Sequence, residues 1–67
     1  MDVIKVNENF YNIKVLGKFF GTIYRNNGMW VLDIPKLGIN ENSQYRNDLI
    51  EGAERAIRES EAKNDHF

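Results

Sequence analysis

The sequence predicts an α+β fold of the order β-β-β-α, in which a small antiparallel sheet of three (or four) strands packs against one C-terminal helix. Two observations predict it. Residues 10–24, where apolar and polar residues alternate at Tyr11–Val15, and the return segment Met29–Ile34 are rich in β-forming residues, and apolar residues recur every three or four positions between residues 46 and 61. The chain has 67 residues, which is room for one domain over residues 1–67, with a frayed polar tail expected from about residue 61.

The first extended region covers residues 10–24. Every second residue of Tyr11–Val15 is apolar, which is the period of a strand with one wet face. The pattern breaks at Gly17 and then resumes, so Gly17 is either a turn between two strands or a bulge in one bent strand. Residues 2–6 contain β-forming side chains and leave an additional edge strand open as an alternative.

A hairpin is predicted at Asn27–Gly28, because Asn-Gly between two β-rich segments tolerates the positive φ angles of a tight turn. The return strand is Met29–Ile34. Pro35 cannot donate to a sheet ladder and is expected to end it. The segment 36–42 is predicted as a loop, with a short strand near Ile39 as an alternative.

A helix is predicted from about Arg46 to Glu61. One stripe of small and apolar side chains faces the sheet, and charged residues occupy the opposite side. The stripe consists of Leu49, Ala53, Ala56, Ile57 and Ser60. Gly52 within this helix costs about 1 kcal/mol against alanine unless it lets the helix lie close to the sheet.

The composition lacks most of the side chains that catalytic and metal sites use. The chain contains no cysteine, and its single histidine, His66, is the second-last residue, so neither a nucleophile nor a metal cluster is expected. We therefore expect a non-enzymatic protein with no cofactor and no metal. The N-terminus does not resemble a signal peptide and no apolar run is long enough to span a membrane, so a cytoplasmic location is expected.

Charge differs between the two halves. Residues 1–40 carry five basic and three acidic side chains, a net charge of +2, whereas residues 41–67 carry four basic and seven acidic ones, a net charge of −3. A mildly basic sheet backed by a helix leaves open an alternative, a sheet-based DNA-binding domain resembling the arm-binding domains of integrases.

Aromatic residues exceed what one small core layer can hold. They lie at Phe10, Tyr11, Phe19, Phe20, Tyr24, Trp30 and Tyr45. Since one sheet face meets the helix, the surplus is expected on a surface that a protein partner or a second copy covers. Trp, Tyr and Arg carry most binding energy at interfaces, so the candidate partner-binding residues are Tyr24, Arg25, Trp30, Tyr45 and Arg46. Core packing of Trp30 is the alternative role for that residue.

The segment Tyr24–Gly38, with its turn, tryptophan strand and Pro-Lys-Leu-Gly exit, resembles the HicB-like antitoxins. The segment 43–46 looks like the short third strand of that family, and Leu49–Ile57 is similar to its alanine-rich helix. The resemblance covers about residues 12–60 and stops before the family's fourth strand and C-terminal DNA-binding module.

The resemblance implies a partial RNase H-like fold and a protein that inhibits a small RNA-cleaving toxin by covering its active site. The expected function is therefore inhibition of a partner protein by occlusion. A phage or mobile-element inhibitor of a host defence enzyme is the alternative with the same mechanism. Either protein could also form a homodimer.

Overall fold

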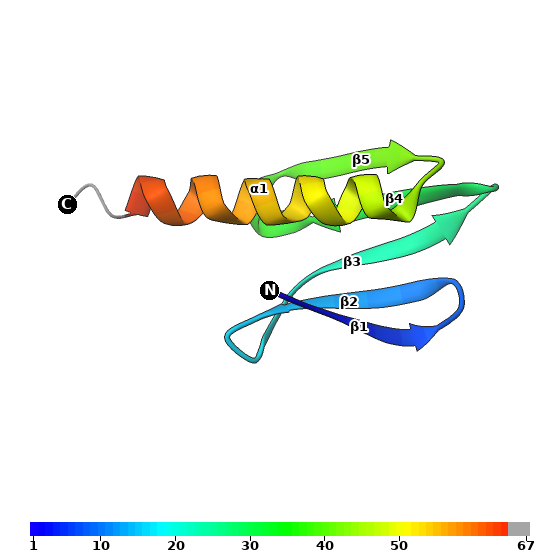
Figure 1. Ribbon diagram of the computed structural model, residues 1–67, viewed down its shortest axis with the longest axis horizontal. Coiled ribbons are helices and arrows are strands. Elements are labelled where there is room, and N and C mark those ends of the chain that lie inside the picture. Colours follow the sequence, from blue (N-terminus) through cyan, green and yellow to red (C-terminus); the bar gives the residue numbers. More distant parts are fainter. Residues whose placement is uncertain (65–67) are drawn as a thin grey trace.

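The computed structural model describes residues 1–64 and shows one antiparallel sheet with a helix across one of its faces (Figure 1). The sheet has five strands, each paired with the next along the chain in the order β1-β2-β3-β4-β5. The elements are β1 (Asp2–Asn7), β2 (Phe10–Val15), β3 (Lys18–Asn26), β4 (Met29–Ile34), a 3₁₀ turn (Pro35–Leu37), β5 (Ile39–Ser43) and α1 (Arg46–Asn64).

The α+β class and the C-terminal helix are confirmed, but the predicted number of strands, three or four, is too low. Residues 2–7 pair with β2, and residues 39–43 pair with β4. Both additional strands lie at the edges of the sheet and are mostly exposed. Each pairs through its backbone on one side, and β5 also packs against α1, so neither strand needs the apolar alternation by which strands are recognised in a sequence.

Two tight turns of the same kind connect the central strands. Leu16 and Gly17 have φ of 53° and 77°, and Asn27 and Gly28 have φ of 53° and 78°. Positive φ at both central residues matches the right-handed twist of the flanking strands. Gly17 is therefore a turn residue, and β2 and β3 are separate strands.

A β-bulge interrupts the pairing of β2 with β3. Ile13 pairs with Gly21, but the next residue, Lys14, pairs with Phe19, so Phe20 is the extra residue. Gly21 lies so close to β4 that a Cβ on it would be 2.6 Å from the carbonyl oxygen of Asp33. The bulge places Phe20 against the core beside a position where no side chain fits.

The core lies between the sheet and α1. It consists of Ile13, Ile23, Leu32 and Ile34 from the strands, with Leu49, Ala53 and Ile57 from the helix. The helix residues are spaced by four, so they form one stripe along the helix. The helix packs mainly on β4 and β5, and leaves much of the β1–β2 hairpin uncovered (Figure 1).

The helix α1 continues to Asn64, past the position near Glu61 where a frayed tail was expected to begin. The rest of that expected tail, residues 65–67, lies outside the described residues.

The register divides the strand residues between two faces, because residues opposite each other in an antiparallel pair point to the same side. The helix side carries the core. The other side, which we call the open face, is not covered by any described element (Figure 1). Its residues are Asp2, Ile4, Asn7, Phe10, Asn12, Lys14, Phe19, Thr22, Tyr24, Asn26, Met29, Val31, Asp33, Asn40 and Asn42.

No helix in residues 1–64 has both the length and the apolar content that a membrane crossing requires.

Candidate functional site

One end of the sheet collects the residues that the sequence singles out. The β1–β2 turn, the β3–β4 turn and the start of α1 all lie at this end, which we call the hairpin end (Figure 1). On its helix side it brings together Arg25, Trp30, Tyr45 and Arg46. Tyr24 lies at the same end but on the open face, since it precedes Arg25 within one strand.

Trp30 is the centre of this cluster. Its side chain is half-buried and packs against the core, and its ring meets that of Tyr11 edge-on at a centroid distance of 5.9 Å. The guanidinium carbon of Arg25 lies 5.9 Å from the Trp30 ring centroid, and that of Arg46 lies 5.6 Å from it. Trp30 thus packs against the core, as the alternative role expected, and also belongs to a surface cluster, while its role in partner binding stays a prediction.

Arg46 connects the helix to the sheet. It is the first residue of α1, its guanidinium carbon lies 4.7 Å from the centroid of the Tyr11 ring, and its Nη1 donates a hydrogen bond to the Tyr11 hydroxyl. Cation–π contacts of partly exposed groups contribute about 0.5–1 kcal/mol each. Arg46 is therefore held in place between two aromatic rings.

Tyr11 is a member of the cluster that sequence reasoning missed. It lies in β2, separated from Trp30 in β4 by the intervening strand β3. Its position on the helix side follows from the alternation Tyr11, Ile13, Val15, which the sequence shows. Its contact with Arg46, 35 residues away, depends on the strand register and on where the helix starts.

The connection between β5 and α1 is ordered by a small hydrogen-bond network. The Ser43 hydroxyl accepts from the Tyr45 backbone N–H at 3.0 Å and donates to the Asp48 carboxylate at 3.3 Å. The Asp48 N–H in turn donates to the Tyr45 carbonyl at 3.2 Å. This network fixes the backbone on both sides of Tyr45, whose side chain is 66% exposed. A shallow hollow lies beside it, lined by Trp30, Gln44, Tyr45, Arg46 and Asn47.

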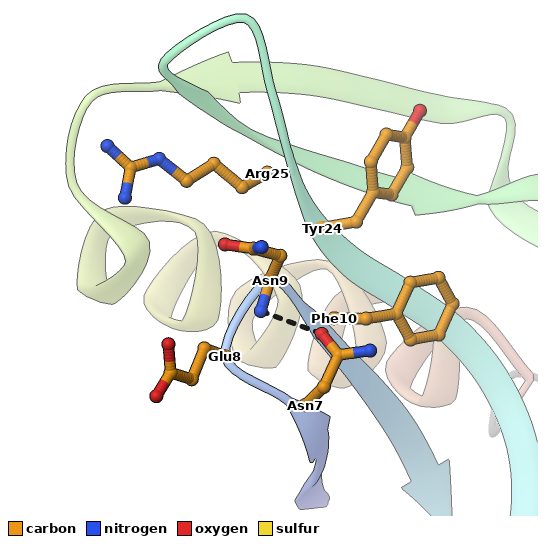
Figure 2. Close-up of a pocket in the computed structure, with 6 residues that line it drawn as sticks. All are labelled: Asn7, Glu8, Asn9, Phe10, Tyr24 and Arg25. Carbon is orange, nitrogen blue, oxygen red and sulfur yellow. Dashed lines mark hydrogen bonds between the residues drawn. The ribbon is translucent and has the colours of Figure 1, made fainter.

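A second hollow lies around the end of the sheet, between the β1–β2 turn and the end of β3 (Figure 2). The rings of Phe10 and Tyr24 stack at a centroid distance of 6.4 Å and project to one side, whereas Arg25 projects to the other. The turn is held by hydrogen bonds from the Asn9 N–H to Asn7 Oδ1 and from the Arg25 N–H to the Asn9 carbonyl. Arg25 thus links this hollow to the Trp30 cluster.

Aromatic and guanidinium groups dominate the hairpin end. Within residues 1–64, no three His, Cys, Asp or Glu side chains lie close enough together to hold a metal ion. The side chains that meet there are aromatic rings and guanidinium groups, which bind by packing, cation–π contact and bidentate hydrogen bonding. His66 lies outside the described residues.

Comparison of the chain with protein-family models, with curated proteins and with solved structures finds no match. The resemblance to HicB-like antitoxins therefore stays a prediction.

Proposed function

We propose that this protein is a non-enzymatic protein-binding module that covers a surface of its partner with the hairpin end. The observation that carries the proposal is the convergence on one surface of Arg25, Trp30, Tyr45 and Arg46, which come from β3, β4, α1 and the connection before α1. Trp, Tyr and Arg are the residue types enriched at interface hot spots.

The cluster is also pre-ordered, which favours binding. Arg46 is held by Tyr11 and Trp30, and the backbone of Tyr45 is held by Ser43 and Asp48. Immobilising a flexible side chain on binding costs about 0.5–1.5 kcal/mol, so a side chain that is already ordered loses less. Tyr45 and Arg25 remain exposed and accessible to a partner.

Binding at such a surface inhibits by occlusion when the partner uses the covered residues. The resemblance to HicB-like antitoxins supports a toxin as the partner, and a host defence enzyme is the alternative. Both give the same expectation for the hairpin end, because each requires a fixed contact surface and no chemistry of the inhibitor's own.

The distribution of charge weighs against the alternative of sheet-based DNA binding. A sheet that enters a groove needs cations on the face that meets the phosphates. Lys14 is the single basic residue among the strand residues of the open face, which also carries Asp2 and Asp33. A duplex DNA titration at low salt tests this alternative, and we expect no sequence-specific binding.

The test of the proposal is an affinity capture from the organism that encodes the protein, with the tagged wild type and three variants. Arg25→Ala and Tyr45→Ala remove exposed side chains of the cluster. The matched control is Phe19→Ala, which removes an exposed aromatic ring, 54% exposed, from the open face. Quantitative mass spectrometry compares the captured proteins.

We expect one protein to be retained by the wild type and by Phe19→Ala, and to be reduced at least tenfold with either cluster variant, since hot-spot truncations cost about 2 kcal/mol or more. Retention that is equal for all four baits, or the absence of any enriched protein, refutes binding through the hairpin end.

A further inference from the structure

We propose that the open face is the contact surface of a homodimer, in which two copies of this chain pack face to face as a β-sandwich. This surface is distinct from the helix-side cluster at the hairpin end, so the proposal does not rest on the proposed function. Three properties of the open face carry it: its apolar content, its charge pattern and its size.

The open face carries an apolar row among mostly uncharged polar residues, and its charges are confined to Asp2, Lys14 and Asp33. Phe10, Tyr24 and Val31 form one continuous row across β2, β3 and β4, and Val31 is only 8% exposed although no element covers it. Ile4 and Phe19 add exposed apolar side chains, 41% and 54% exposed, and the polar pair Asn12–Thr22 separates Phe19 from this row. Layered folds place such a face against a second layer, and the described elements provide none.

Two of the three charges of the open face complement each other between copies, while the third, Asp2, lies opposite Lys14 within its own chain. Lys14 lies on β2 and Asp33 on β4, on either side of the central strand β3. A two-fold axis parallel to β3 exchanges these two sides, so that each Lys14 lies over the strand that carries the partner's Asp33. The two residues are offset by two positions along the strands, about 7 Å, and stacked sheets lie about 10 Å apart, so extended lysine and aspartate side chains together bridge the distance. This arrangement favours a second copy over an acidic or a basic partner.

The face has an area at the lower limit for a stable dimer. Five strands about 4.8 Å apart, with six residues at about 3.3 Å each, give roughly 480 Å² per copy. Two copies together bury of the order of 1,000 Å², at the threshold where specific interfaces begin. The net charge of −1 adds little repulsion between copies. We therefore expect a reversible dimer with a Kd in the micromolar range.

Sedimentation equilibrium of the full chain tests the proposal. Phe19→Asp places a charge at an exposed position of the open face and is expected to raise the dimer Kd at least tenfold, or about 1.4 kcal/mol. The matched control is Tyr45→Asp, at an exposed aromatic residue outside the face. Its Kd is expected to stay within about threefold of the wild-type value.

A charge exchange tests the orientation of the two copies. Asp33→Lys alone is expected to weaken the dimer, because it brings two cations together, and adding Lys14→Glu is expected to restore it. Asp33→Lys alone is more informative than Lys14→Glu alone. Asp2 lies opposite Lys14 within the same chain, so Lys14→Glu also places two acidic residues opposite each other in that chain. Fluorescence of Trp30, the chain's one tryptophan, reports folding from the opposite side of the sheet.

A wild type that remains monomeric at about 1 mM overturns the proposal. A dimer that Tyr45→Asp weakens and Phe19→Asp does not also overturns it, because its interface then lies at the hairpin end. The face-to-face arrangement is overturned if the variant with both Asp33→Lys and Lys14→Glu is folded but does not regain the dimer affinity that Asp33→Lys lost. In affinity capture a change at Tyr45 is the test and a change at Phe19 is the control, whereas in the dimer measurement Phe19 is the test and Tyr45 the control. Failure of the proposed function is therefore distinguishable from failure of the dimer proposal.

Discussion

Gly21→Ala is predicted to destabilise the protein more than any other change of one methyl group. A Cβ at this position would lie 2.6 Å from the Asp33 carbonyl oxygen and 2.9 Å from Ile34 Cγ1. The first of these atoms belongs to the backbone of β4, so the clash is relieved only if β3 and β4 move apart. Introducing volume into a well-packed core costs about 1–3 kcal/mol, and we expect the upper part of that range.

The expected loss of about 2–3 kcal/mol is large for this chain. Domains of this size are stabilised by roughly 0.05–0.15 kcal/mol per residue. A change of 1 kcal/mol shifts the Tm of a small domain by about 4–8 °C, so Gly21→Ala is expected to lower the Tm by roughly 10–20 °C.

Gly52→Ala is the matched control, since it adds the same methyl group at a glycine in α1. The nearest atom to its Cβ would be Glu41 Oε2 at 3.7 Å, an ordinary van der Waals contact. Gly52 therefore does not bring the helix close to the sheet backbone, and alanine is expected to stabilise by about 0.8–1 kcal/mol through helix propensity.

Thermal and urea unfolding, followed by circular dichroism and by Trp30 fluorescence, measure both changes. The reasoning is refuted if Gly21→Ala unfolds within about 0.5 kcal/mol of the wild type, or if Gly52→Ala destabilises the chain.

Three further changes have definite expected outcomes. Leu16 is 94% exposed with φ of 53°, so Leu16→Asn is expected to raise the unfolding free energy by about 1 kcal/mol, measured in urea, because asparagine tolerates the left-handed conformation. Arg46→Met and Tyr11→Phe in a double-mutant cycle are expected to show a coupling free energy of about 1 kcal/mol for their hydrogen bond, and additivity would contradict that contact. Tyr45→Ala is expected to change the Tm by less than about 3 °C in a thermal scan, since its exposed ring serves binding and not folding.

The central part of the fold could be predicted because its signals are local. Apolar alternation marks β2, a run of apolar residues before Pro35 marks β4, and a stripe at four-residue spacing marks α1. The turn at Asn27–Gly28 is recognisable from both of its residues, whereas Leu16–Gly17 has the same backbone conformation with only one favourable residue. Leucine is not a typical residue at positive φ, so the sequence did not decide between a turn and a bulge at Gly17.

The edge strands were harder to predict for a different reason. β5 has the sequence Ile-Asn-Glu-Asn-Ser, with one apolar residue, and its partner strand β4 stabilises it through the backbone. β1 is apolar at Val3, Ile4 and Val6, which do not alternate regularly, and a register shift between Lys5 and Asn7 interrupts its pairing. Backbone pairing leaves no pattern in the side chains, so the number of strands was underestimated.

For the candidate site, residue type was a better guide than position. The choice of Trp, Tyr and Arg placed four of five residues on one side of the hairpin end, although α1 and β4 meet there only in the folded chain. Tyr24 is separated from that cluster by strand geometry alone, because neighbours in a strand point to opposite faces. The role of Tyr11 needed the register, which no pattern in the sequence supplies.

The bulge at Phe20 decides which aromatic ring is exposed, and it connects the core to the open face. Regular alternation from Ile23 through Gly21 would place Phe19 on the helix side and Phe20 on the open face. Because Phe20 is the extra residue, it packs against the core, and Phe19 joins Lys14 on the open face. The bulge and the close approach of Gly21 to β4 are adjacent, so a change that loosens β3 at Gly21 is also expected to disturb the placement of Phe19. If the open face is the dimer surface, Gly21→Ala must therefore weaken dimerisation as well as folding, whereas Gly52→Ala must leave the dimer Kd unchanged.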